Sequence, residues 1–390
     1  MGQGYVGLPL ALAAAQAGYQ VFGVDNDEKK VRLLANCKSP VEGVSDSLIR
    51  DQIEIENYIP TSDIQVISES EFVLICVPTP LDIDHQPDLK ALISATTTVA
   101  RNMLKGTTVI VESTIGPGTS RNMLIPILIE ESGLKEDDFN FVFSPERIDP
   151  MNKSWDIKNT PKLVAGASTY AANRAEKFYR KFIDDIYKCS SLEIAEAAKL
   201  LENTFRLVNI SLVNELSIYF SKIGIDSREV IMAAATKPYG FLPFYPGIGA
   251  GGHCIPVDPI YLSNAAKSVG APTEFIDLAD KVNRQMPRYF VDKVEKILGG
   301  FTKKKIVVVG IAYKPDVSDT RESPAENLII GLRAKGAVVV WHDDLVKEWN
   351  GEKSVTLSSD FDLAIIATPH DYLDLTMLGN VPILNTRGII

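Results

Sequence analysis

The stretch GQGYVGLPLALAAAQAGYQVFGVD, residues 2–25, decides the fold of the first part of the chain. Gly2, Gly4 and Gly7 give the spacing G-x-G-x-x-G, and an apolar helical pattern follows at once. Glycines at this spacing allow a tight turn and let a pyrophosphate approach the N-terminus of the next helix. Asp25 ends the following strand, where a carboxylate accepts from ribose hydroxyls and repels a 2′-phosphate. The stretch predicts a dinucleotide site that favours NAD over NADP, although glycine triplets also occur in ordinary turns.

A loop of this kind normally follows a buried strand, whereas only Met1 precedes Gly2. We interpret this as a missing first strand, through truncation or a misassigned gene start, in preference to a genuine strandless variant. A central parallel strand is hydrogen-bonded along both edges. We therefore expect the chain as written to be poorly soluble or to bind NAD weakly.

Buried strands alternate with helices at both ends of the chain, and the middle is helical. Continuous runs of Val, Ile and Phe predict strands buried on both faces. These runs are residues 21–25, 72–78, 107–113 and 139–145, and then 305–310, 337–342, 362–370 and 382–385. Leu192 to Lys222 contains no Gly or Pro and predicts one long helix. The predicted fold is α/β, with two Rossmann-like doubly wound domains joined by a long central helix and a helical region. The expected boundaries are 1–189, 190–298 and 299–390.

Composition narrows the class of protein. The chain has 390 residues and a formal net charge of -10, which disfavours nucleic acid as a partner because phosphate binding needs clustered Lys and Arg. No apolar run reaches the roughly 18 residues of a membrane span, and no basic segment marks a signal peptide. The four cysteines are widely spaced and form no metal-ligand cluster, so we expect no metal and a reducing cytoplasm.

A glycine-rich loop carries the candidate nucleophile. Residues 247–259 read GIGAGGHCIPVDP, with Cys254 at the end of the glycine run. A thiol becomes a better nucleophile when a cation lowers its pKa, although a buried structural cysteine is the plain alternative. Lys199, Asn203 and Arg206 share one face of the long helix and could supply the cation. From spacing alone, a solvated polar stripe explains the same three residues.

Seven blocks of sequence, taken in order, resemble the UDP-glucose/UDP-N-acetylhexosamine 6-dehydrogenase family. They are GQGYVGLPLA from residue 2, VPTP at 77–80, ESTIGPGT at 112–119, SPERI at 144–148, KLLENTFRLVNISLVNE at 199–215, GAGGHCIPVDP at 249–259 and GIAYKPDVSDTRESPA at 310–325. The resemblance covers nearly the whole chain. It implies an NAD domain, a central helix with a dimerisation region, and a C-terminal UDP-binding domain.

The resemblance also implies roles for individual residues. The catalytic group would be Cys254 as nucleophile, Lys199 and Asn203 at the substrate and oxyanion, Asp258 and Thr114 for water and proton transfer, and Glu146 for hydrolysis. The cofactor group would be Gly2, Gly4, Tyr5, Val6, Gly7, Asp25, Lys30, Thr79, Ser113 and Arg321. The substrate group would be Arg206, Gly251 and Lys314. Met151 stands where relatives often place glycine, so we expect a local loop change there.

The implied reaction is a double oxidation of a sugar primary alcohol to a carboxylate through a cysteine thiohemiacetal and thioester. GGHCIPVDP and SPERI favour a UDP-N-acetylhexosamine over UDP-glucose, and the implied role is uronic acid supply for surface polysaccharide. Expected partners are the UDP-sugar and a second copy of the chain, with no nucleic acid or membrane. A 3-hydroxyacid or 6-phosphogluconate type of dehydrogenase is the rival enzyme class. A catalytically inactive sugar-nucleotide-binding fragment is the rival of another class.

Overall fold

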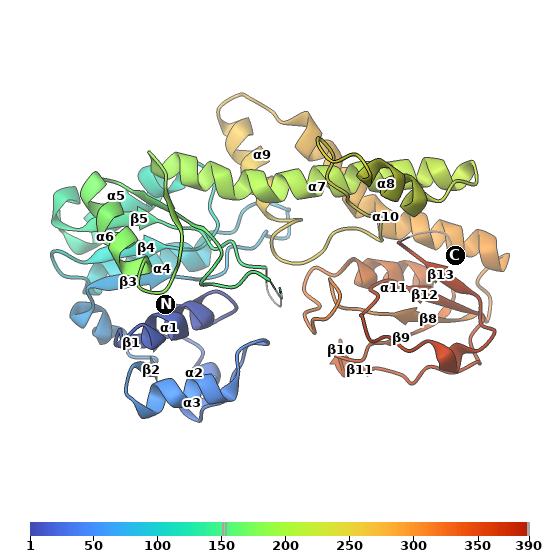
Figure 1. The fold of residues 1–390 in the computed structure, drawn as a ribbon, viewed down its shortest axis with the longest axis horizontal. Helices are drawn as coiled ribbons and strands as arrows, with labels where there is room; N and C mark the ends of the chain where they lie inside the picture. The colour runs from blue at the N-terminus through green and yellow to red at the C-terminus, as the bar shows by residue number, and fades with distance from the viewer. Residues whose placement is uncertain (150–151, 153, 388–390) are drawn as a thin grey trace. The chain divides into compact units, whose positions relative to one another are not determined.

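The computed structural model describes residues 1–149, 152 and 154–387. The chain divides into two compact units, Met1–Leu201 and Glu202–Ile390, which are described separately below (Figure 1). Met151, where a loop change is expected, lies outside the described residues. No helix in the described part of the chain is both long and apolar enough to cross a bilayer.

The first unit is an α/β layered structure with two sheets. One sheet has the strand order β3-β4-β5-β6-β7, and the other consists of β1 and β2. The strands are β1 (Val21–Val24), β2 (Tyr58–Thr61), β3 (Phe72–Ile75), β4 (Thr108–Val111), β5 (Asn140–Phe143), β6 (Lys162–Gly166) and β7 (Ile186–Lys188). The helices are α1 (Gly7–Gln16), α2 (Glu28–Ala35), α3 (Asp46–Glu54), α4 (Lys90–Asn102), α5 (Ile125–Ser132) and α6 (Thr169–Tyr179), with short helical turns η1 (Ile64–Glu69), η2 (Ser120–Leu124) and η3 (Glu136–Asp138).

The alternation of strands and helices in the sequence predicts a wholly parallel sheet. The five-stranded sheet of the first unit differs from this prediction, because it is mixed. β3, β4 and β5 are parallel, but β6 runs antiparallel to β5. The first residue of β6 therefore lies at the edge where β4 and β5 end. This arrangement brings residues that follow three different strands to one edge of the sheet.

The first two residues bridge the two sheets of this unit. The backbone N–H of Gly2 donates to the carbonyl of Val24 at 2.8 Å, and the carbonyl of Met1 accepts from the N–H of Cys76 at 2.9 Å. β1 follows the glycine loop, and Cys76 follows β3. The glycine loop is thus fixed by hydrogen bonds to residues at the ends of two strands.

The second unit contains a four-stranded parallel sheet in the order β13-β12-β8-β9. Its strands are β8 (Lys305–Val309), β9 (Val338–His342), β10 (Glu348–Trp349), β11 (Glu352–Lys353), β12 (Leu363–Ile366) and β13 (Ile383–Asn385). Its helices are α8 (Ser227–Ala235), α9 (Asp258–Ser268), α10 (Glu274–Leu298) and α11 (Pro324–Ala334), with the turn η4 (Thr376–Leu378). Side chains of α10 and α11 pack with those of β8 and β9 in one apolar core.

A buried pair of side chains, Asp343 and His370, closes the carboxyl end of β9. Oδ2 of Asp343 accepts from the N–H of Ile311 at 2.8 Å and lies 3.2 Å from Nε2 of His370. Both side chains of the pair have no exposed surface. Burial alone would lower the pKa of His370, but its hydrogen bond to Asp343 reverses the shift, so the pKa is raised. Burial opposes ionisation of Asp343 too, yet His370 and backbone N–H donors lower its pKa to about 2.

The long helix α7 (Leu192–Lys222) has the bounds that the sequence predicted and runs through the boundary between the units. Most predicted strands are present but shorter. The strand expected at 362–370 stops at Ile366, because Pro369 has no N–H to offer a ladder. The strand expected at 72–78 stops at Ile75, shortly before Pro78. The prediction missed β2, β6, β7, β10 and β11, which are only two to five residues long.

Candidate functional site

The glycine loop has the geometry that a bound pyrophosphate needs. Gly2 has a φ of 85°, and a Cβ on Gly7 would lie 1.8 Å from the carbonyl oxygen of Gly2. Side chains are therefore excluded where the loop turns back on itself. The N-cap residue of α1, Val6, makes no side-chain hydrogen bond to the first turn of the helix, and a Cβ on Gly4 would meet nothing within 4 Å. The N–H groups at the positive end of α1 suit a phosphate.

Asp25 follows β1 and lies against this loop. Its Oδ2 accepts from the N–H of Gln3 at 2.7 Å and from Nζ of Lys30 at 2.8 Å, and its Oδ1 accepts from the N–H of Asp27 at 3.0 Å. Burial raises the pKa of Asp25, but Lys30 and the two N–H donors outweigh it, so the pKa is lowered. A carboxylate has about four acceptor positions, so three are filled. One position remains for a ribose hydroxyl, and the part-exposed ammonium of Lys30 lies beside it.

The remaining cofactor residues of this unit lie near the loop or at strand ends. Tyr5 and Val6 are partly buried within the loop itself. Ser113 follows β4, and its hydroxyl donates to the carbonyl of Val77 at 2.7 Å, which joins the segment after β4 to the segment after β3. Thr79 is partly buried in that second segment. Ligands of open α/β sheets bind outside the carboxyl ends of the strands, where these residues lie.

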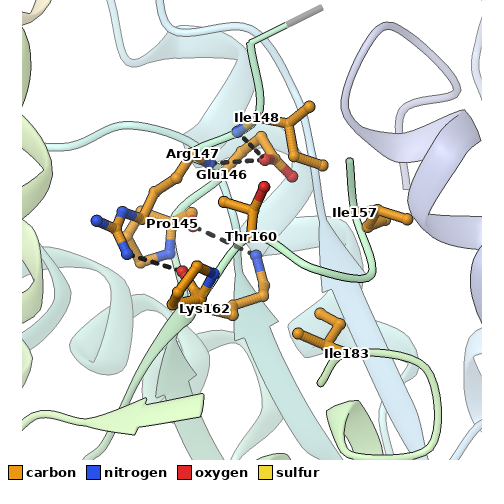
Figure 2. Close-up of a pocket in the computed structure, with 9 residues that line it drawn as sticks. Pro145, Glu146, Arg147, Ile148, Ile157, Thr160, Lys162 and Ile183 are labelled. Carbon is orange, nitrogen blue, oxygen red and sulfur yellow. Dashed lines mark hydrogen bonds between the residues drawn. The ribbon is translucent and has the colours of Figure 1, made fainter. Parts of the chain in front are cut away.

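Thr114 and Glu146 also follow strands of this sheet, β4 and β5. The backbone N–H of Glu146 donates to the carbonyl of Glu112 at 3.4 Å. Its Oε1 accepts from the N–H groups of Arg147 at 2.6 Å and Ile148 at 2.5 Å (Figure 2). A cavity of about 10 Å³, enough for roughly one water molecule, lies beside this carboxylate. It is lined by Pro145, Glu146, Arg147, Ile148, Ile157, Thr160, Pro161, Lys162 and Ile183.

The three residues of the predicted polar face on the long helix α7 differ in how deeply they are buried. Lys199 is 7% exposed and Asn203 is 9% exposed, whereas Arg206 is exposed. A solvated stripe is therefore wrong for the first two. Nδ2 of Asn203 donates to Oδ2 of Asp258 at 2.6 Å, and the N–H of Asp258 donates to the carbonyl of Cys254 at 2.9 Å. This pair of hydrogen bonds connects α7 to the cysteine loop within the second unit.

Two buried asparagines hold the glycine run before Cys254. Asn283, on α10, accepts from the N–H of Ala250 at 2.6 Å and donates to its carbonyl at 3.1 Å. Oδ1 of Asn214, on α7, accepts from the N–H of Gly247 at 2.8 Å. The loop is thus anchored from two helices. Neither asparagine was predicted from the sequence, although each lies on a long helical segment and is a polar residue on a buried face.

The cysteine loop also packs closely against residues 313–324. A Cβ on Gly251 would lie 2.5 Å from the carbonyl oxygen of Glu322, and one on Gly252 would lie 2.7 Å from the ring of Tyr313. Gly252 also has a φ of 83°. Only glycine fits these two positions, which accounts for the glycine run. Lys314, a predicted substrate residue, follows Tyr313 and is partly buried.

Cys254 is exposed, while the other three free cysteines, Cys37, Cys76 and Cys189, are partly buried. Burial raises the pKa of Cys76 to about 12, so its thiol is not a nucleophile at neutral pH. Arg321 pairs with Asp319, with Nη2 and Oδ2 2.6 Å apart. Burial, aided by the charge of Arg321, lowers the pKa of His253. Among the described residues no group of three or more His, Cys, Asp or Glu side chains could hold a metal ion.

Comparison with known proteins gives a consistent result. Three domain models of the UDP-glucose/GDP-mannose dehydrogenase family match: the NAD binding domain over residues 1–183, the central domain over 193–285 and the UDP binding domain over 307–390. The chain is 38% identical over 333 residues to a UDP-N-acetyl-D-glucosamine 6-dehydrogenase of Salmonella typhi, covering 82% of this chain and 76% of the relative.

Two solved structures share the fold over 99% of this chain. A UDP-N-acetyl-mannosamine dehydrogenase from Pyrococcus horikoshii has a TM-score of 0.90 at 32% identity, with 94% of that chain covered. A UDP-glucose dehydrogenase from Pyrobaculum islandicum has a TM-score of 0.90 at 25% identity, with 93% covered. The fold therefore does not distinguish among these sugars.

Proposed function

Since the chain belongs to the UDP-glucose/GDP-mannose dehydrogenase family and is an NAD-dependent nucleotide-sugar dehydrogenase, we propose that it oxidises C6 of a UDP-N-acetylhexosamine to the carboxylate. The alcohol loses two hydrides in succession. NAD, when bound, takes up the hydride in each oxidation. The glycine loop and Asp25 would hold the pyrophosphate and a ribose hydroxyl, as their geometry permits. Thr79, Ser113, Lys30 and Arg321 are the further proposed cofactor residues.

Cys254 is the proposed nucleophile. Its thiolate adds to the carbonyl carbon of the intermediate aldehyde and forms a carbon–sulfur bond, giving a thiohemiacetal. An aldehyde has no readily lost hydride until such an addition makes its carbon tetrahedral. Loss of the second hydride leaves a thioester on Cys254. Water then attacks the thioester carbon and the carbon–sulfur bond breaks. The sulfur of Cys254 departs as a thiolate, and the sugar carboxylate is the product.

Lys199 and Asn203 are the proposed stabilisers of the oxyanion at the tetrahedral stages. The hydrogen bond between Asn203 and Asp258 supports a shared task on the helix and the cysteine loop. Asp258 and Thr114 would organise water and proton transfer, and Glu146 would assist hydrolysis. Arg206, Gly251 and Lys314 are the proposed substrate residues, and they match the family's motif blocks.

The sequence of the cysteine loop, GGHCIPVDP, supports an N-acetylhexosamine substrate, as do the names of several relatives. UDP-glucose is the second candidate, because the Pyrobaculum UDP-glucose dehydrogenase has the same fold. We also propose that the product supplies uronic acids for surface polysaccharide, which is the role that the family resemblance implies. The four free cysteines support a reducing cytoplasm.

We infer that the chain acts as a homodimer through α7. Phe205, Leu212, Leu216 and Tyr219 are 40% to 56% exposed. They recur at helical spacing along one helix, and a row of large exposed apolar residues is typical of a protein interface. We also propose three functional parts, 1–189, 190–298 and 299–390, and the order of the three matched domain models supports this division.

The observation that carries this proposal is the buried hydrogen-bonded link from Asn203 through Asp258 to the backbone of Cys254. The test is NADH production with UDP-N-acetylglucosamine, UDP-N-acetylmannosamine and UDP-glucose. Two NADH for each sugar consumed would support it, whereas one NADH would favour the 3-hydroxyacid type of dehydrogenase. Absence of turnover together with a thermal shift by NAD and a UDP-sugar would instead indicate a binding fragment.

A further inference from the structure

Three polar side chains of the first unit form a buried network that the proposed chemistry does not use: Glu112, Lys162 and Tyr179. Nζ of Lys162 donates to Oε2 of Glu112 at 2.6 Å, and the hydroxyl of Tyr179 donates to Oε1 of Glu112. Their side chains are 6% exposed for Lys162 and not exposed for the other two. Nζ of Lys162 also lies 5.2 Å from the centre of the Tyr179 ring.

Lys162 keeps its charge despite burial, whereas burial raises the pKa of Glu112. Burial alone would lower the pKa of Lys162, but the negative charges of Glu112 and Glu146 outweigh it, so the pKa is raised. The lysine therefore stays an ammonium at neutral pH. A buried ion pair is costly to desolvate, and apolar residues of similar volume often stabilise a fold equally well. Stability alone is thus a weak explanation for a lysine at this position.

The network lies beside the segment that carries Glu146. Lys162 begins β6, which runs antiparallel to β5, so its side chain reaches the end of β5. There Nζ donates to the carbonyl of Pro145 at 3.3 Å. In the opposite direction Nη1 of Arg147 donates to the carbonyl of Pro161 at 2.7 Å (Figure 2). Two side chains therefore cross-link residues 145–147 to residues 161–162, one on each side of Glu146.

We propose that Lys162, held in place by Glu112 and Tyr179, is a positioning residue that fixes the Glu146 carboxylate for thioester hydrolysis. This inference rests on the proposed function. Lys162 acts through the backbone of Pro145 and does not touch the substrate. Thr114 follows Glu112 by two residues, so the same network also anchors the segment that carries Thr114. Thioester hydrolysis therefore depends on this network more strongly than binding of the UDP-sugar does.

The test compares Lys162→Met, which removes the ammonium, with Lys162→Arg, which keeps a cation and its donors. Misplacing a catalytic group by about 1 Å costs roughly a hundredfold. We expect Lys162→Met to slow thioester hydrolysis roughly ten- to hundredfold. The acylated Cys254 should then accumulate in single-turnover mass spectrometry. The KM for the UDP-sugar should stay within about twofold, because no binding contact is lost. Lys162→Arg should recover most of the hydrolysis rate.

Val164→Ala is the matched control, because Val164 is a fully buried residue of the same strand and has no part in the network. It should lower the melting temperature without accumulation of the acyl-enzyme. If Lys162→Met hydrolyses the thioester no more slowly than Val164→Ala, the proposal is overturned. Should Lys162→Met not fold, the double variant Glu112→Gln/Lys162→Met carries the same test, since it leaves no charge buried alone.

Hydrogen exchange gives a readout that needs no substrate. The N–H groups of Arg147 and Ile148 are bonded to Glu146 and should exchange slowly in the wild type. We expect severalfold faster exchange in a peptide covering residues 144–149 of Lys162→Met, with recovery in Lys162→Arg. Unchanged exchange would refute the positioning role. If the wild type oxidises no UDP-sugar, the proposed function fails, while this measurement still decides separately whether Lys162 holds the Glu146 segment in place.

Discussion

The side-chain amide of Asn283 pairs with both backbone groups of Ala250, four residues before Cys254. It accepts from the N–H at 2.6 Å and donates to the carbonyl at 3.1 Å, as a neighbouring strand would. The side chain is 5% exposed, so water cannot easily replace it. The glycine run therefore has a fixed path although its glycines permit many conformations.

Asn283→Ala should reduce kcat about ten- to hundredfold, because a nucleophile displaced by about 1 Å loses rate on that scale. It should also destabilise the second unit by about 1–3 kcal/mol for each backbone group left unbonded. Steady-state kinetics and urea unfolding measure both effects. Asn209→Ala is the control, since the Asn209 side chain donates to the carbonyl of Phe205 within its own helix. Equal kcat values for the two variants would contradict the anchoring role.

Cys254→Ser should abolish carboxylate formation and leave UDP-sugar binding largely intact, because the hydroxyl is a far poorer nucleophile than a thiolate. Product analysis by mass spectrometry and calorimetric binding measure the two properties. Cys37→Ser serves as the control and should retain full turnover. A fully active Cys254→Ser variant would remove the nucleophile assignment.

Lys199→Ala should lower turnover by roughly a hundredfold or more, the scale for losing one preorganised oxyanion donor. Lys222→Ala, an exposed lysine at the end of the same helix, is the matched control and should change turnover little. The assay is initial NADH formation at saturating substrate. A loss below about threefold for Lys199→Ala would be incompatible with a role at the oxyanion.

Asp25→Ser should weaken NAD binding and improve the relative use of NADP. The carboxylate that repels a 2′-phosphate is removed, and Lys30 is released from its 2.8 Å contact to meet that phosphate. In Asp25→Ser/Lys30→Ala the gain with NADP should disappear. The ratio of kcat/KM for the two cofactors measures the change. An unchanged ratio in Asp25→Ser would show that Asp25 does not contact the ribose.

The Asp343–His370 pair predicts how the stability of the second unit depends on pH. The raised pKa of His370 stabilises the folded state fully below its ordinary value of 6.5, and this contribution is lost as pH rises through the folded pKa. Asp343 contributes above its ordinary 3.8 and loses its contribution as pH falls toward about 2. The stability gap between wild type and His370→Gln should therefore narrow above neutral pH. In a Trp155→Phe background, where the first unit has no tryptophan, fluorescence of Trp341 and Trp349 during urea unfolding reports on this unit. A gap that widens with pH would contradict the pairing.

The fold could be predicted from sequence where apolar runs are long and unbroken. Helix α7 was predicted with its observed bounds because no Gly or Pro interrupts its 31 residues. β6 could not be predicted as antiparallel, because five residues with a lysine at one end carry no information about direction. The pairing of Lys162 with Glu112, 50 residues apart, likewise arises only in the folded chain.

The candidate site was predicted in the same uneven way. The glycine loop, Asp25 and Cys254 are each marked by local sequence. Burial of Lys199 and Asn203 distinguishes them from a solvated stripe, and spacing could not show it. Asn214 and Asn283 support the cysteine loop from two helices, and nothing local to either residue indicates that contact.

The buried pair at the end of β9 bears on how many dinucleotides one chain can hold. Asp343 directly follows β9 in the second unit, as Asp25 directly follows β1 in the first unit. Each carboxylate accepts a hydrogen bond from a backbone N–H of the loop that precedes its strand. Lys30 is partly exposed beside Asp25, whereas His370 is fully enclosed with Asp343. Moreover, the next helix after Gly310 is α11, which begins only at Pro324. The turn at Gly310, which follows β8, is therefore not followed directly by a helix N-terminus. Calorimetric titration should accordingly saturate at one NAD per polypeptide.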